Sequence, residues 1–342
     1  MEVAEYKAKI ERSPEGFYLF VGEEEYLKRH YLSELKKRLV PDAFLEPFNY
    51  VVFDGGEIDF GKILDAIKAP PMMADYKLIV WKYPEIEKMK EKAREALDEL
   101  GAMAQDYPYS VLVFLVGKDS FDVGTLPKKP SKLYTRYSKS FNVVNFKSST
   151  EPQLIAWLAR HFEAEGIRAD ADTLRALLFR SGHSMDVLSS EVDKLAAYAK
   201  ANGLDTVTAR EIELVASSTV ECDAFALSNA IGERNHALAF RVLSQMKLER
   251  TDPLVILGML IRTYTELLAV STLMSEGKGQ DEIAAVTKIN PYKVKLAMAS
   301  VRRAGSERIF RATKLLGEVD ARAKSSYVDV YALLERFLAV VL

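Results

Sequence analysis

Short, continuous apolar runs recur along the first 146 residues of the chain. They lack the alternation of apolar and polar side chains that marks a strand with one solvent-exposed face. Continuous runs of this length are typical of strands buried on both faces of a mainly parallel sheet. The predicted strands are residues 17–22, 49–54, 77–81, 111–116 and 143–146.

Between these runs, apolar side chains recur at helical spacing. The pattern predicts helices over residues 27–39, 59–68 and 85–104. Strands that alternate with helices indicate an α/β domain.

From Ser149 onward, nearly the whole chain has helical patterns. Capping-box signals at Thr150–Gln153 and Thr208–Glu211 mark two helix starts. We therefore expect an α/β domain over residues 1–146, a small helical domain over 147–212 and a larger helical domain over 213–342.

Composition and charge narrow the class of protein. Hydrophobic residues make up 49% of the 342 and charged residues 28%, which is ordinary globular composition. The net charge of -2 provides no global positive field for nucleic acid. The single cysteine, Cys222, excludes an internal disulfide. The N-terminus lacks the apolar core of a signal peptide, and the apolar stretches 111–117 and 254–261 are too short to span a membrane. We expect a cytoplasmic protein with no membrane segment.

Gly22 follows the first predicted strand, where a phosphate-binding loop would lie. Gly22 and Lys28 are in register with the glycine and lysine of the pattern G-x-x-x-x-G-K-[ST], but Leu27 and Arg29 replace its other two positions. Three glutamates, 23–25, stand where backbone amides would hold phosphates, and they would repel a nucleotide. An acidic helix N-terminus, which the helix dipole favours, is the preferred interpretation over a working ATP site.

No catalytic constellation is visible elsewhere. The strands 77–81 and 111–116 are not followed by the acidic residues that would hold Mg²⁺ in an ATPase. The cysteine and the four histidines lack zinc spacing, and no nucleophile motif occurs. We expect no catalytic residue, no metal and no cofactor in this chain.

Two adjacent methionines, Met72 and Met73, follow two prolines between a predicted helix and the strand 77–81. Prolines end the helix, so the methionines lie in a loop. They either fold back onto the core or form an exposed, adaptable apolar anchor. As an anchor, their burial would contribute about 3–6 kcal/mol before the costs of association.

Basic residues concentrate in two places. Residues 128–147 hold six Lys or Arg and no acidic residue, and the last helices carry further basic clusters. Such a run either contacts nucleic-acid phosphates or forms a solvated basic face, which is the more common case.

Six segments and two charged residues form an ordered pattern over the whole chain: FYLFVGEEEYLKRHY (17–31), PPMMADYKLIVWK (70–82), SSEVDKLAAYA (189–199), VTAREIELVAS (207–217), DPLVILGMLIRTYTELL (252–268), IAAVTKINPYKVKLA (283–297), and Asp320 with Lys324. In this order and spacing they resemble the delta subunits of bacterial DNA polymerase III, the clamp-opening subunits of the clamp loader.

The resemblance implies an AAA+-like architecture. Its parts are a RecA-like α/β domain with a mainly parallel sheet, a helical lid and a helical collar that assembles with other loader subunits. Delta subunits are not ATPases, which agrees with the degenerate loop at Gly22 and Lys28. In the family an apolar pair inserts into a hydrophobic pocket of the sliding clamp. Here the pair corresponds to Met72 and Met73, flanked by Pro71 and Ala74, where relatives often have Leu-Phe.

The family also places an aromatic residue near the start of the last helix, against the primer–template junction. Tyr327 is the candidate here, with Lys324 beside it, although a shift of one residue would place Ser326 at that position. A tyrosine packed between collar helices is the alternative.

The implied function is binding rather than catalysis, although the family is classed with DNA-directed DNA polymerase as a holoenzyme subunit. The chain would bind and open the sliding clamp so that it can be loaded on primed DNA. Its partners would be the clamp (beta), the other loader subunits and primed DNA within the assembly. The alternatives are an AAA+ ATPase, a DNA-binding protein of unknown role, and a helical scaffold with a buried methionine pair.

Overall fold

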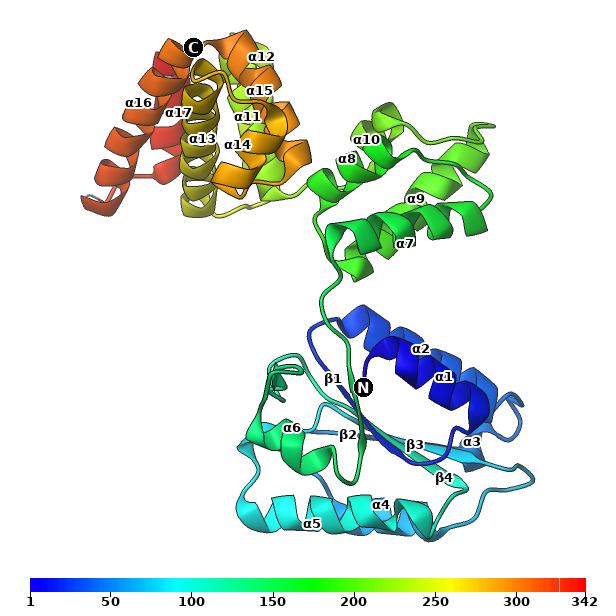
Figure 1. Cartoon of the computed structure of the whole chain (residues 1–342). Helices are drawn as coiled ribbons and strands as arrows, with labels where there is room; N and C mark the ends of the chain where they lie inside the picture. Colours follow the sequence, from blue (N-terminus) through cyan, green and yellow to red (C-terminus); the bar gives the residue numbers. More distant parts are fainter. Residues whose placement is uncertain (326) are drawn as a thin grey trace. The chain divides into compact units, whose positions relative to one another are not determined.

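The computed structural model describes residues 1–325 and 327–342. The chain divides into two compact units, the α/β unit Met1–Thr150 and the helical unit Glu151–Leu342. Figure 1 shows both units in the colours of the sequence.

The α/β unit is built on one five-stranded parallel sheet with the order β2-β3-β4-β1-β7. β1, β3 and β4 are almost completely buried, as expected for continuous apolar runs. The parallel α/β sheet and its five predicted strands are confirmed. The strands are β1 (Phe17–Val21), β2 (Tyr50–Asp54), β3 (Lys77–Lys82), β4 (Ser110–Leu115) and β7 (Asn142–Asn145), and a separate hairpin pairs β5 (Gly124–Thr125) with β6 (Lys129–Pro130).

Helices cover both faces of this sheet. Buried side chains of α1 (Val3–Arg12) and α2 (Glu25–Leu39) pack on one face. Those of α4 (Phe60–Lys68), α5 (Glu91–Ala102) and α6 (Lys132–Tyr137) pack on the other. Figure 1 shows α1 and α2 opposite α4 and α5. The short α3 (Glu46–Asn49) leads directly into β2.

One predicted helix differs from the observed structure. Residues 85–104 form a 3-10 turn, η1 (Ile86–Lys88), then α5, then a second turn, η2 (Met103–Gln105). The chain is extended at Met89 and Lys90 because η1 places Ile86 in the core before α5 begins.

The regular secondary structure described for the helical unit consists of the helices α7 to α17. Their bounds are α7 (Glu151–Ala164), α8 (Ala171–Ser181), α9 (Met185–Ala201), α10 (Ala209–Val215), α11 (Val220–Gly232), α12 (His236–Leu248), α13 (Pro253–Ser275), α14 (Gln280–Thr287), α15 (Pro291–Ala304), α16 (Ser306–Ser325) and α17 (Val330–Val341). The all-helical second part of the fold is confirmed. The capping box predicted at Thr208 is present and opens α10.

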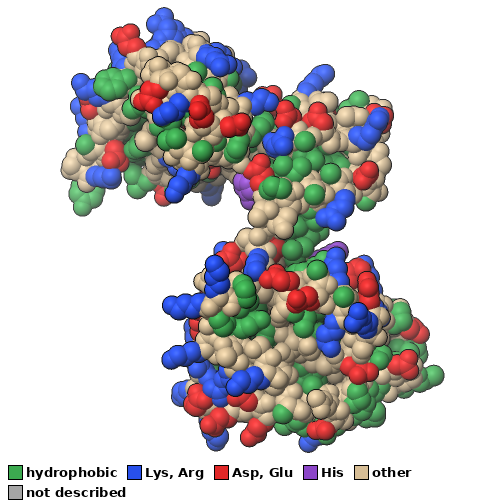
Figure 2. Space-filling view, viewed as in Figure 1, with side chains coloured by type: hydrophobic (Ala, Val, Ile, Leu, Met, Phe, Trp, Pro, Cys, Tyr) green, Lys and Arg blue, Asp and Glu red, His purple; other side chains and the backbone are tan. Residues whose placement is uncertain are grey.

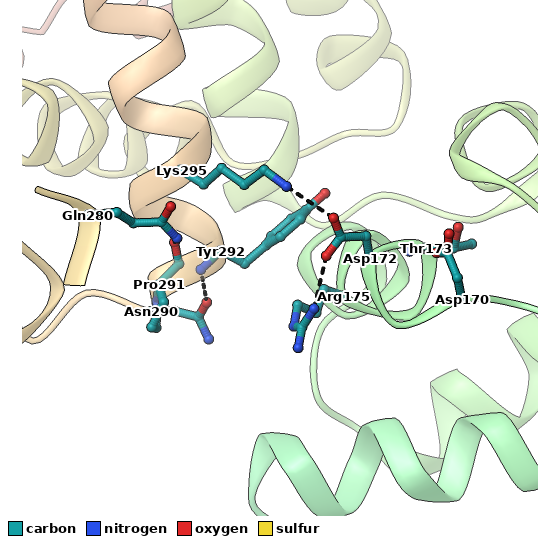
Figure 3. A network of polar contacts seen from close by, with 9 residues as sticks. All are labelled: Asp170, Asp172, Thr173, Arg175, Gln280, Asn290, Pro291, Tyr292 and Lys295. Atoms are coloured by element: carbon teal, nitrogen blue, oxygen red, sulfur yellow. Dashed lines mark hydrogen bonds and ion pairs between the residues drawn. The ribbon is translucent and has the colours of Figure 1, made fainter.

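Polar contacts tie α8 to the helices that follow. Asp172 forms ion pairs with Arg175, at 2.9 Å, and with Lys295 of α15, at 3.0 Å. Asn290 caps α15 by accepting a hydrogen bond from the amide of Tyr292 at 2.8 Å (Figure 3). Both predicted helical domains lie within one compact unit, and the domain boundaries at 146 and 212 stay predictions.

α13 is the central helix of the larger helical group. It extends the apolar stretch at 254–261 to 23 residues and is long and apolar enough to cross a membrane. However, Ile256, Leu260 and Val270 are fully buried in a core shared with α11, α15 and α16. Packing inside a helical core therefore accounts for the apolar side chains on the buried face of this helix.

We expect Leu260→Ala to lower the free energy of unfolding by about 2–5 kcal/mol, because it leaves a cavity in this core. Leu254, which is 54% exposed on the same helix, provides a matched control. Leu254→Ala should change stability by no more than about 0.5 kcal/mol. Urea unfolding of both variants measures the difference, and equal losses would contradict the assignment of α13 as the core helix.

Candidate functional site

Two loops meet at the edge of the sheet where its strands begin, here called the amino edge. β2 and β3 are neighbouring parallel strands, with Tyr50 opposite Leu78. Parallel neighbours begin at the same edge, so α3, which enters β2, and residues 69–76, which enter β3, come together. We call residues 69–76 the methionine loop.

Asn49 fixes the backbone of the methionine loop. Its side chain is fully buried and pairs with both polar backbone groups of Met72. Oδ1 accepts a hydrogen bond from the Met72 amide at 2.7 Å, and Nδ2 donates one to the Met72 carbonyl at 2.8 Å. Because both functional groups of the amide side chain are used, its burial is compensated.

A second buried side chain holds the start of the same loop. Lys77 is 3% exposed and donates a hydrogen bond from Nζ to the carbonyl of Ala69 at 2.6 Å. Burial lowers the pKa of this ammonium group. The loop backbone is thus anchored at Ala69 by Lys77 and at Met72 by Asn49.

The anchored loop presents its methionine side chains to solvent. Met72 is 45% exposed and Met73 is 84% exposed, with Met73 in the left-handed backbone region at a φ of 51°. Pro71 and Ala74 are half-buried on either side. The alternative prediction, that both methionines fold back onto the core, does not agree with this exposure.

Sequence reasoning located the methionines but missed the two residues that position them. Asn49 and Lys77 were interpreted as the first residues of apolar strands. A polar residue opening an otherwise buried strand is the available signal, but the partner of Asn49 lies 23 residues away and could not be inferred.

The Gly22 loop lies at the opposite, carboxyl edge of the sheet. Lys28 is fully buried, and burial lowers the pKa of its ammonium group. Nζ donates hydrogen bonds to the carbonyls of Gly22 at 2.9 Å and Val116 at 2.6 Å, and pairs with Glu25 at 2.6 Å. Lys28 occupies the position of the P-loop lysine, and all three N–H donors of its ammonium group are engaged within the chain.

The backbone of this loop is engaged as well. The amide of Glu24 donates a hydrogen bond to the carbonyl of Phe146 at 3.0 Å. A Cβ on Gly22, whose φ is 105°, would lie 2.4 Å from that same carbonyl oxygen. Glycine is therefore needed here for close backbone packing against the end of β7.

Other candidate chemistry is sparse in the part of the chain that the structure describes. Among those residues, no group of three or more His, Cys, Asp or Glu could hold a metal ion. Cys222 is buried, and burial raises the pKa of its thiol to about 11. The thiol is therefore protonated at neutral pH and is a poor nucleophile.

The candidate DNA-contacting residues precede α17. Tyr327 is fully exposed, so it is not packed between helices. Lys324 pairs with Asp320 one turn earlier at 2.7 Å. Ser326, the alternative for the aromatic position, lies outside the described residues.

Part of the basic run at 128–147 is neutralised locally. Arg136 pairs with Glu91 and Asp98, and Lys147 pairs with Glu2. Figure 2 shows blue side chains on the flank of the α/β unit that carries α6. The other lysines of this run, Lys128, Lys129, Lys132 and Lys139, are exposed.

We expect Lys28→Met to lower the free energy of unfolding by about 1–3 kcal/mol, because two carbonyls lose their buried donor. Lys37→Met, on the exposed face of the same helix, should change it by no more than about 0.5 kcal/mol. Thermal unfolding measures both stability changes, and repeating it with Mg-ATP tests whether the chain binds nucleotide. An ATP-dependent rise in the wild-type midpoint that Lys28→Met abolishes would show that the lysine binds phosphate.

Comparison with known proteins agrees with this arrangement. The family models for "DNA polymerase III, delta subunit" and its C-terminal domain match residues 18–130 and 221–341. DNA polymerase III subunit delta of Bacillus subtilis is 25% identical over 325 residues, covering 94% of this chain and 91% of the relative. A probable delta subunit of Aquifex aeolicus is 23% identical and covers 95% and 90%.

A solved structure has the same fold. The Bacillus subtilis DNA clamp loader delta protein superposes with a TM-score of 0.54 at 22% identity, covering 98% of both chains. Two family models and two near-full-length relatives thus agree on one family. The chain belongs to the family of DNA polymerase III delta subunits.

Proposed function

We propose that this chain binds the sliding clamp through Met72 and Met73 and holds it open for loading on primed DNA. One observation carries the proposal: the two methionines are exposed on a loop whose backbone is held by hydrogen bonds from the buried side chains of Asn49 and Lys77. Membership of the delta family supports the choice of partner.

An exposed methionine pair on a fixed backbone suits insertion into an apolar pocket. The unbranched thioether adapts to the shape of the pocket, and its burial contributes about 1.5–3 kcal/mol per side chain. Asn49 and Lys77 order the backbone before binding, so less conformational entropy is lost on association.

Opening the clamp requires more than binding it. A ligand shifts an equilibrium only by its difference in affinity for the two states. The chain therefore binds the open clamp more tightly than the closed one. ATP acts from partner subunits, because Lys28 and the Gly22 loop are engaged within this chain.

The remaining parts of the chain serve assembly. The larger helical domain, residues 213–342, forms the collar that contacts other loader subunits, and residues 147–212 form the lid that joins it to the α/β domain. Tyr327 and Lys324 face primed DNA within the assembled loader. Because the proposed role is in bacterial DNA replication, we expect the complex in the cytoplasm.

The double variant Met72→Ala/Met73→Ala should lower the affinity for the cognate clamp by about 30-fold or more, because central apolar anchors dominate interface energies. Leu214→Ala is the control, since Leu214 is an exposed apolar residue (66%) on α10. Titration calorimetry measures binding, and separation of two fluorophores across the clamp interface measures opening. Equal affinity of the wild type and the folded double variant would refute the assignment.

Asn49→Ala keeps both methionines but frees the loop backbone. We expect a smaller loss of affinity, about 3- to 10-fold, because the loop must then be ordered at the moment of binding. A more negative binding entropy than that of the wild type would identify the positioning role. Unchanged binding affinity and binding entropy would show that the hydrogen bonds from Asn49 to the Met72 backbone are dispensable for clamp binding.

A further inference from the structure

Exposed apolar side chains of the α/β unit concentrate at its amino edge. All residues of this unit are described, and six of them are large, apolar and exposed. Four of the six lie either in the methionine loop or in the segment that enters β2. The six are Phe44, Phe48, Val52, Met72, Met73 and Tyr83.

The segment that enters β2 comprises residues 40–49, here called the phenylalanine segment. Phe44 is 80% exposed and Phe48 is 51% exposed. Polar contacts help to hold the segment in place. The amide of Phe44 donates to Asp42 Oδ1 at 2.8 Å, and Glu46 pairs with Lys36 of α2 at 2.6 Å.

The phenylalanine segment and the methionine loop lie next to each other at the amino edge. Asn49, the last residue of the segment, bonds the backbone of Met72. A hollow of about 510 Å³ is lined by Leu45 and Asn49 from the segment, by Met73 and Ala74 from the loop, and by arginines at the ends of α1 and α2. Figure 1 shows α3 and the loop between α4 and β3 at the same end of the sheet.

Two methionines alone provide too little contact for a stable interface. Specific interfaces bury roughly 800 Å² on each partner and are enriched in aromatic residues and methionine. A phenylalanine can bury about 150–250 Å². Phe44 and Phe48 are therefore suited to extend the contact that the methionine pair begins.

We infer that Phe44 and Phe48 form a second contact site for the sliding clamp, and that the clamp covers the hollow between this site and the methionine loop. The inference rests on the proposed function. It adds residues from a different segment, which enters a different strand, to the same interface.

The test compares four folded proteins in clamp binding: the wild type, Met72→Ala/Met73→Ala, Phe44→Ala/Phe48→Ala, and the control Phe310→Ala. Phe310 is a 60% exposed phenylalanine on α16. We expect the Phe44/Phe48 variant to bind about 5- to 30-fold more weakly than the wild type, and Phe310→Ala to bind like the wild type. Circular dichroism and unfolding midpoints establish that all four are folded.

The outcomes separate this inference from the proposed function. Loss of affinity in both double variants, but not in the control, supports the second site. If only the methionine variant loses affinity, the second site is overturned and the proposed function stands. If the wild type does not bind, or the methionine variant binds normally, the proposed function fails, and the inference fails with it.

Discussion

Parallel strand pairing is the constraint on which the two sites of the α/β unit depend. Because all five strands of the main sheet run in one direction, loops that enter strands lie at one edge and loops that leave them lie at the other. Met72 and Asn49 belong to the first edge, and Gly22 belongs to the second. The sheet thus separates the surface proposed for the clamp from the place where a related fold would hold nucleotide.

Buried polar side chains stabilise both edges. A buried amide or ammonium group is costly unless its hydrogen bonds are satisfied. The amide of Asn49 is satisfied by the backbone of the methionine loop, to which Lys77 also donates a hydrogen bond. Lys28 is satisfied by Glu25 and by the backbone that follows β1 and β4. At the amino edge these groups order a loop for contact. At the carboxyl edge they engage the lysine that would otherwise contact phosphate. This arrangement supports the part of the proposed function that assigns ATP to partner subunits.

The sequence predicted the elements better than their long-range contacts. Continuous apolar runs identify the strands, and for β1, β3 and β4 the reason is that both faces of the sheet are covered. The capping box at Thr208 marks a helix start. The helix α1 was not predicted, although its capping box between Glu2 and Glu5 is local. The pairing of Asn49 with Met72 was beyond sequence reasoning, because it depends on β2 and β3 being neighbours. The burial of Lys28 was equally hidden, since its register alone resembles that of a phosphate-binding lysine.

Hydrogen–deuterium exchange of the chain, alone and with its cognate clamp, tests the central claim most directly. The account predicts slower amide exchange over residues 40–49 and 69–76 in the complex, with residues 22–28 unchanged. Slower exchange at residues 22–28, with the amino edge unaffected, would contradict it.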